Sequence, residues 1–112
     1  MAIYGSIDQL IGKTPLLELT NTEKKLGLNA RIVAKLEYFN PAGSVKDRIA
    51  EAMFDDAEES GKLNKNSVII EATSGNTGIG LASVGTARGY RVIIVAYPSL
   101  DKRVGLVAGI DI

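Results

Sequence analysis

Residues 68–96 read VIIEATSGNTGIGLASVGTARGYRVIIVA, and this stretch decides the fold. Its two ends, residues 68–72 and 91–96, are apolar runs of the kind that suits parallel strands covered on both faces. The small residues over 77–88 predict a helix between these strands, and Gly89 closes it. We therefore expect a βαβ unit with a right-handed crossover.

The clearest helix is predicted upstream of this unit, over residues 45–60. It carries an apolar stripe at the spacing of one helix face, made of Val45, Ile49, Met53 and Ala57. We expect this stripe to pack against the sheet. Ser44 is predicted to cap the helix in a capping box with Asp47, and Gly61 to end it.

The segments at either end of the chain complete the prediction. Before the long helix, short strands are predicted at 16–19 and 31–37, with a helical turn between them at 21–27. A loop is predicted at 38–43. After the βαβ unit, residues 101–109 predict a short helix, and 109–112 predict the start of a further strand. A strand that begins where the sequence ends leaves an open sheet edge, which indicates a truncated or partial protein.

Length and composition fit a folded α/β domain. The chain has 112 residues, of which 46% are apolar and 23% charged. Such values suit one globular domain, which commonly has ~100–150 residues. The expected fold class is α/β, with a partial three-layer parallel sheet (a βαβ core) and an N-terminal strand pair, forming one domain over residues 1–112.

Charge and missing residue types exclude several functions. Thirteen basic and thirteen acidic residues cancel, so the chain lacks the basic surplus of a nucleic-acid-binding protein. Without cysteine or histidine, the chain can form no disulfide, Ser-His triad or Cys/His metal site, and no metal is predicted. The apolar run over 92–97 is too short to cross a membrane, and no secretory signal opens the sequence. We expect a cytoplasmic protein without a membrane partner.

The first candidate site lies in residues 40–48, which put Lys46 in the first turn of the predicted helix. Unpaired N–H groups and the helix dipole disfavour a further positive charge there, which favours the neutral, nucleophilic amine of a Schiff-base enzyme. The alternative is a solvated lysine at a helix start, with Ser44 only capping the helix. Arg48 is expected to pair with Glu51 or Asp56 on the helix surface.

The second candidate site is the loop over 73–80, which joins a predicted parallel strand to a helix. Ligands of open α/β sheets bind at the carboxyl edge of the strands. The loop's N–H groups, glycines, hydroxyls and amide predict an anion site for a carboxylate or phosphate. It matches neither the P-loop nor the Rossmann spacing of glycines. The alternative is a helix cap of small residues with nothing bound.

Both loops carry a family resemblance. Residues 35–48 read KLEYFNPAGSVKDR, residues 71–82 read EATSGNTGIGLA, and residues 11–16 read IGKTPL. In this order and spacing, the three motifs resemble the cysteine synthase (O-acetylserine sulfhydrylase) family. That family belongs to the fold-type II pyridoxal-phosphate enzymes, together with cystathionine β-synthase.

The resemblance implies a role for each site residue. Lys46 is implied to hold pyridoxal phosphate through a Schiff base and later to transfer a proton. Asn76 is implied to bond the 3′-oxygen of the cofactor. The implied binding site for the substrate carboxylate consists of Thr73, Ser74, Gly75, Asn76 and Thr77. The implied reaction is β-replacement, in which sulfide displaces acetate from O-acetylserine and L-cysteine forms.

The chain departs from the family in length. The family's phosphate-binding loop and the serine at the pyridine nitrogen come later than this sequence reaches, so we expect the isolated chain to be inactive. The apolar strand over 92–96 is expected to seek a partner, giving a homodimer or larger oligomer. Two alternatives remain open. One is a non-catalytic remnant or engineered fragment, acting as an anion-binding or oligomerising domain, and the other is a small nucleotide- or anion-binding module using residues 73–80.

Overall fold

The computed structural model describes residues 1–73 and 75–95. The elements follow one another as η1 (Ile7–Leu10), β1 (Leu16–Glu18), α1 (Thr20–Leu26), β2 (Val33–Lys35), η2 (Glu37–Phe39), α2 (Lys46–Glu59), β3 (Val68–Ala72), α3 (Asn76–Ala87) and β4 (Arg91–Val95). Ser74, Ala96 and the elements predicted over 101–109 and 109–112 lie outside the described residues. The predicted mixture of α and β elements is confirmed.

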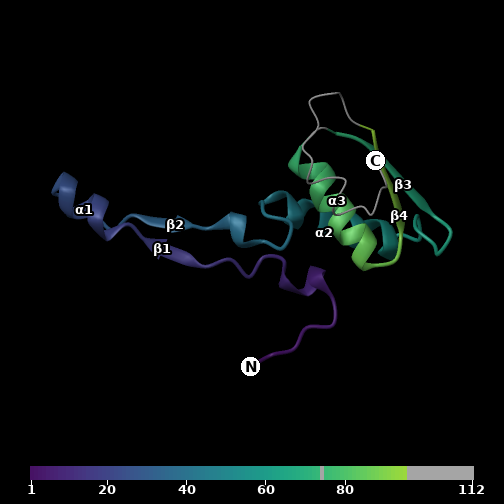
Figure 1. Cartoon of the computed structure of the whole chain (residues 1–112), viewed down its shortest axis with the longest axis horizontal. Helices are drawn as coiled ribbons and strands as arrows, with labels where there is room; N and C mark the ends of the chain where they lie inside the picture. The colour runs from purple at the N-terminus through teal and green to yellow at the C-terminus, as the bar shows by residue number, and fades with distance from the viewer. Residues whose placement is uncertain (74, 96–112) are drawn as a thin grey trace.

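A narrow arm projects from the body of the protein (Figure 1). It consists of β1 and β2, paired antiparallel with Leu17 opposite Ala34, and of α1 at the tip. Gly27 ends α1 in the left-handed conformation, which glycine adopts without strain. The predicted N-terminal strand pair and the helical turn between its strands are thus confirmed.

The body is built on a parallel strand pair. Strands β3 and β4 align from Val68 opposite Arg91 to Ala72 opposite Val95, as predicted. Along β3, half-buried Ile69 packs on the core, whereas Val68 and Ile70 are exposed. Among the described residues, one face of this sheet is therefore open. The expected cover on both faces is not seen there, because both helices of the body pack around the core that Ile69 faces.

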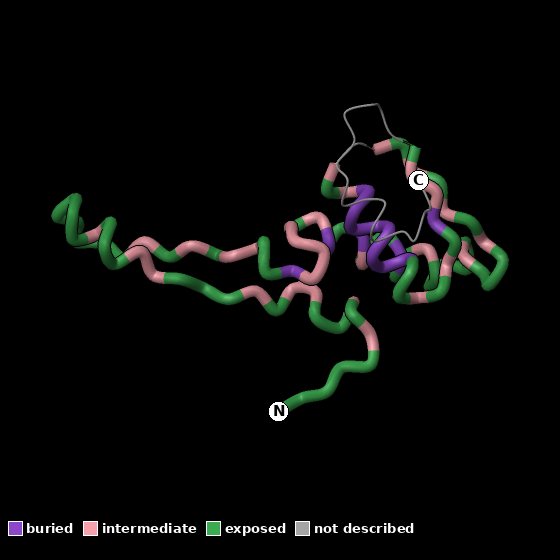
Figure 2. The backbone as a smooth tube through the Cα atoms, in the orientation of Figure 1, coloured by how far each residue is buried: buried purple, intermediate pink, exposed green. Residues whose placement is uncertain are grey.

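Helix α3 forms the centre of the body, and its residues from Gly78 to Gly85 are all buried (Figure 2). Its glycines let other elements approach closely. A Cβ at Gly85 would lie 2.4 Å from Val92 Cγ2 and 3.0 Å from the Phe54 ring. The core cluster comprises Ala50, Phe54, Leu81 and Val84. Close packing of this kind needs small residues at the contact and large ones beside it.

The predicted buried face of α2 is wrong. Of the predicted stripe, Val45, Ile49 and Met53 are 45%, 43% and 48% exposed, and Ala57 alone is half-buried. The buried residues of the helix are Asp47, Ala50 and Phe54. The helix packs where its surface fits α3, since Ala50 meets Gly80 and Phe54 meets Gly85. Shape decides the orientation here more strongly than the number of apolar side chains on a face. The homodimer or larger oligomer expected from the sequence stays a prediction, because the structure describes one copy.

Replacing Gly85 by alanine should destabilise the fold. The new methyl group would lie 2.4 Å from the Cγ2 atom of stiff, β-branched Val92. Overpacking costs about 1–3 kcal/mol, and so short a contact belongs at the upper end of that range, at about 2–3 kcal/mol. Alanine recovers about 1 kcal/mol through its helix propensity. We expect a net decrease of about 1–2 kcal/mol in the free energy of unfolding, measured by urea titration of the far-UV circular dichroism.

Gly5→Ala is the matched control, since nothing lies within 4 Å of a Cβ at that position. It should leave the unfolding midpoint within error of the parent chain. A Gly85→Ala chain as stable as the parent would contradict the described packing.

Candidate functional site

Helices α2 and α3 run in the same direction and begin near each other. A Cβ at Gly80 would lie 3.0 Å from the carbonyl oxygen of Lys46 and 3.2 Å from Ala50 Cβ. Further along both helices, Phe54 lies against Gly85. The first turn of α2 therefore packs on the part of α3 about one helical turn after its first residue.

This shared end lies at the carboxyl edge of the parallel strands. Thr73 follows the last residue of β3, and its N–H donates to the carbonyl oxygen of Val95, the last residue of β4, at 3.0 Å. Helix α3 begins at Asn76, just beyond that point. The structure thus brings the Lys46 turn to the edge where ligands of open α/β sheets bind.

The loop before α3 is held by small residues. The hydroxyl of Thr73 accepts a long bond of 3.4 Å from the N–H of Gly75. A Cβ at Gly78 would lie 2.3 Å from Thr73 Cγ2, so only glycine lets the loop fold back on the helix. At Gly75, by contrast, no described residue lies within 4 Å of a Cβ, so the described part of the chain leaves the backbone there uncovered.

The predicted loop residues that the structure describes differ in how far they are buried. Thr73, Gly75 and Thr77 are half-buried, and Asn76 is exposed in the first turn of α3. Ser74 lies outside the described residues. The described loop residues gather at the N-terminus of α3, where backbone N–H groups and the helix dipole favour an anion.

The first turn of α2 is capped differently from the prediction. Val45 occupies the N-cap position in helical conformation and makes no side-chain cap bond. The Ser44 hydroxyl accepts a bond from the N–H of Lys46 at 3.1 Å. The Asp47 carboxylate accepts from the N–H of Ala42 at 2.6 Å, where the capping box would have turned it to Ser44. The capping box is therefore wrong, because Asp47 closes the preceding turn instead.

Asp47 is the most unusual group beside Lys46. Its side chain is 1% exposed, and its Oδ1 atom has no hydrogen-bond partner among the described residues. Burial raises the pKa of this carboxyl group, and the bond from Ala42 offsets only part of that effect. A buried carboxyl group with one unbonded oxygen is costly to ionise, so burial favours the neutral form of Asp47 itself.

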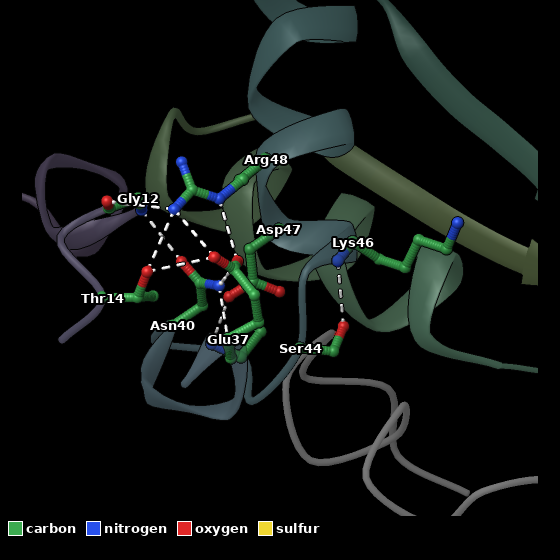
Figure 3. Close-up of polar contacts among 9 residues, drawn as sticks. Gly12, Thr14, Glu37, Asn40, Ser44, Lys46, Asp47 and Arg48 are labelled. Carbon is green, nitrogen blue, oxygen red and sulfur yellow. Dashed lines mark hydrogen bonds and ion pairs between the residues drawn. The ribbon is translucent and has the colours of Figure 1, made fainter. Parts of the chain in front are cut away.

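Arg48 leaves the same turn in the opposite direction from Lys46 (Figure 3). Its guanidinium forms a bidentate pair with Glu37, at 2.9 Å from Nε to Oε2 and 3.0 Å from Nη2 to Oε1. It also donates to the Gly12 carbonyl and the Thr14 hydroxyl, each at 3.1 Å. The predicted surface pair with Glu51 or Asp56 is wrong, because a bidentate partner and two further acceptors outside the helix claim the guanidinium.

Asn40 joins this network from the turn before the helix. It is 3% exposed, and its amide donates to the Glu37 carbonyl oxygen at 2.7 Å and to Glu37 Oε2 at 2.8 Å. Its Oδ1 atom accepts from the N–H of Gly12 at 2.8 Å. The side chain is thereby bonded at both ends, and it ties residues 12–14 to the turn that leads into α2.

Glu37 is the acceptor at the centre of the network. The Arg48 guanidinium, with smaller effects from Asn40 and Thr14, lowers the pKa of this carboxyl to about 2. The residues of this network were not predicted as site residues. All of them lie in the motifs that carry the family resemblance, and that was the only signal in the sequence for them.

Other features lie apart from this site. An apolar hollow of about 140 Å³ lies further along α2, lined by Met53, Phe54, Ala57, Leu63, Ile69 and Leu81. Within residues 1–73 and 75–95, no cluster of acidic side chains is arranged to hold a metal ion. In the same ranges, no helix has the length and apolarity to span a bilayer.

Comparison with known proteins gives a consistent result. The family described as pyridoxal-phosphate dependent enzymes matches residues 7–104. Cystathionine beta-synthase of Saccharomyces cerevisiae is 52% identical over 90 residues, which are 80% of this chain and 18% of that protein. A probable cysteine synthase of Bacillus subtilis is 48% identical over 102 residues, which are 91% of this chain and 32% of that protein.

Solved structures agree in fold. A hydrogen sulfide-producing enzyme from Fusobacterium nucleatum superposes with a TM-score of 0.86 at 41% identity, covering 97% of this chain and 35% of that one. An O-ureido-L-serine synthase gives a TM-score of 0.84 at 39% identity, covering 96% and 34%. The chain thus spans about a third or less of the length of these relatives.

The Glu37–Arg48 pair should make the free energy of unfolding depend on pH in the acidic range. Because the pKa of Glu37 is lower in the folded state, the pair stabilises the fold fully at pH values above the pKa of the unfolded chain, which is about 4.3. This contribution should disappear as the pH falls through the folded value of about 2. Glu37→Gln should therefore be less stable than the parent at pH 7, with the difference vanishing towards pH 2, measured as urea midpoints.

Glu59→Gln, at the exposed end of α2, is the matched control and should change the midpoint little at either pH. If the gap between Glu37→Gln and the parent were constant from pH 7 to pH 2, the described ion pair would be wrong.

Proposed function

Because this chain belongs to the family of pyridoxal-phosphate dependent enzymes, we propose that it is the lysine-bearing part of a β-replacement enzyme. The reaction we propose is the displacement of acetate from O-acetylserine by sulfide, which yields L-cysteine. The relatives named probable cysteine synthase and cystathionine beta-synthase support chemistry of this class. We propose cysteine as the product, and cystathionine is the alternative product.

One observation carries the proposal: the Lys46 turn and the start of α3 lie together. The Lys46 carbonyl oxygen is 3.0 Å from the Cβ position at Gly80, one helical turn after Asn76. A lysine that forms a Schiff base must lie beside the groups that hold its amino-acid substrate. The fold thus brings two loops that are far apart in sequence to the edge where ligands of open α/β sheets bind.

The residues present fit one half of a pyridoxal-phosphate site. The open space beside Gly75 leaves room for a ligand at the N-terminus of α3. The side chains there are hydroxyls and an amide, which can donate to a carboxylate beside the N–H groups of the helix N-terminus. When bound, pyridoxal phosphate supplies an electron sink for carbanion chemistry on amino acids. By resemblance, the loop for its phosphate lies beyond this sequence.

Lys46 is proposed to hold the cofactor through its amine and then to move a proton at the substrate Cα. The neighbouring Ser44 hydroxyl is engaged by the N–H of Lys46, so it fixes the backbone of the lysine. The side chain is left as the moving part.

The loop before α3 is proposed to bind and orient the substrate. Its proposed carboxylate ligands are Thr73, Ser74, Gly75, Asn76 and Thr77. The Asn76 amide is also proposed to bond the 3′-oxygen of the cofactor. Gly78 supports this role indirectly, because a larger residue would displace Thr73. A fixed carboxylate holds the amino acid in the orientation in which its Cα proton faces the lysine.

The isolated chain should react with pyridoxal phosphate at Lys46 and yet make no cysteine. Borohydride reduction followed by peptide mass mapping should find the pyridoxyl group on Lys46 in preference to Lys62, because α2 holds Lys46 at the proposed binding edge. Lys46→Ala should abolish this preferred label, and Lys62→Ala should preserve it. Cysteine formation from O-acetylserine and sulfide should be negligible, since the phosphate half of the site is missing.

Equal labelling of Lys46 and Lys62 in the parent chain would contradict the proposed role of Lys46. Robust cysteine synthesis by the isolated chain would contradict the proposal that half of the site is missing. Binding of acetate or phosphate at Gly75–Thr77 that is unchanged in Lys46→Ala, without any labelling of Lys46, would favour the anion-binding module instead.

A further inference from the structure

The polar network around Arg48 extends well beyond the surface of α2. It joins segments that are distant in sequence: residues 12–14, residues 37–40 and the first turn of α2. Figure 3 shows these side chains gathered on one side of the turn, while the Lys46 side chain extends on the other. The network therefore binds the first turn of α2 on the side opposite to the Lys46 side chain.

The contacts are of the kind that fixes direction as well as position. A bidentate guanidinium–carboxylate pair constrains both partners to one plane. The Thr14 hydroxyl bridges the two charges, donating to Glu37 Oε1 at 3.0 Å and accepting from Arg48 Nη2 at 3.1 Å. Thr14 therefore links the two charged side chains directly.

The first turn of α2 is constrained on both sides. Val45 at its N-cap makes no side-chain bond, and the Ser44 hydroxyl accepts from the N–H of Lys46 at 3.1 Å. On its other side, the Lys46 carbonyl oxygen lies 3.0 Å from the Cβ position of Gly80 in α3. A small rotation of the turn would either press this oxygen into α3 or pull it away, and both movements redirect the Lys46 side chain.

We propose that Arg48 is a positioning residue for Lys46, and that Glu37, Asn40, Thr14 and the Gly12 carbonyl act with it to set the direction in which the lysine leaves α2. Residues 12–14 thereby support the lysine site indirectly. Their contacts in the network are to Glu37, Asn40 and Arg48. This inference rests on the proposed function, in which Lys46 is the reactive group.

The expected effect is large for a residue that does not touch the reacting atoms. A displacement of about 1 Å at a reacting group can cost about 100-fold in rate. Loss of one bidentate partner should shift the turn by less than that. We expect Arg48→Gln to decrease the reactivity of Lys46 by about 10-fold.

The test measures the environment of the lysine separately from its reaction with the cofactor. In the first arm, all lysines of the full chain are methylated with ¹³C-formaldehyde and borohydride, and the Lys46 signal is assigned by its loss in Lys46→Arg. Arg48→Gln and Thr14→Val should move this signal towards those of exposed lysines. In the second arm, pyridoxal phosphate and borohydride give the ratio of Lys46 to Lys62 labelling, which should fall about 10-fold.

Arg31→Gln is the matched control. Arg31 forms a similar bidentate pair with Glu18, at 2.8 Å and 3.0 Å, but on the projecting arm. Its loss should leave both readouts unchanged. An unmoved Lys46 signal in folded Arg48→Gln and Thr14→Val would overturn the proposal. Unfolding of both variants would also overturn it, since the network would then hold the whole fold.

The two arms separate this inference from the proposed function. If pyridoxal phosphate shows no preference for Lys46 in the parent chain, the proposed function fails. The methyl signal then still decides whether Arg48 sets the direction of the lysine. If the preference exists and Arg48→Gln leaves both readouts unchanged, only the positioning role fails.

Discussion

The close approach of α2 to α3 at Gly80 is the constraint from which the arrangement of the site follows. A Cβ there would lie 3.0 Å from the Lys46 carbonyl oxygen, so a larger residue would require the helices to move apart by a few tenths of an ångström. The contact fixes which face of α2 is buried and aligns the starts of the two helices. It also brings Lys46 and the loop before α3 to the same sheet edge.

The rest of the α2 turn is built to keep that contact. Asp47 closes the preceding turn through the N–H of Ala42, and Arg48 holds Glu37 on the far side. Leaving Asp47 Oδ1 buried without a partner among the described residues costs stability. Proteins often keep such costly groups where a reactive side chain must be held, since functional sites break rules that the rest of a structure obeys.

The sequence predicted the elements better than it predicted their packing. The parallel pair, both helices of the body and the N-terminal strand pair follow from local apolar patterns and breakers, which act over a few residues. The buried face of α2 could not be predicted that way. Val45, Ile49 and Met53 form the more apolar stripe, yet the helix turns Ala50 and Phe54 inward because α3 presents glycines to them.

The candidate site divides in the same manner. Lys46 and the loop from Thr73 to Thr77 were identified by chemistry that a sequence displays, a lysine at a helix start and small polar residues after a strand. The network of Glu37, Asn40 and Arg48 depends on contacts between distant segments, and the helical spacing of charges suggested other partners for Arg48. Motif resemblance located these residues without indicating what they contact.

The most direct test of this account is an NMR measurement of distances at the Gly80 contact. Nuclear Overhauser effects should join the Ala50 methyl group and the Lys46 turn to the Gly80 α-protons, since Ala50 Cβ lies 3.2 Å from the Cβ position there. The methyl groups of Ile49 should show no such effects to α3. Effects from Ile49 to α3 in place of those from Ala50 would mean that α2 is turned the other way, and the shared edge on which the site depends would not exist.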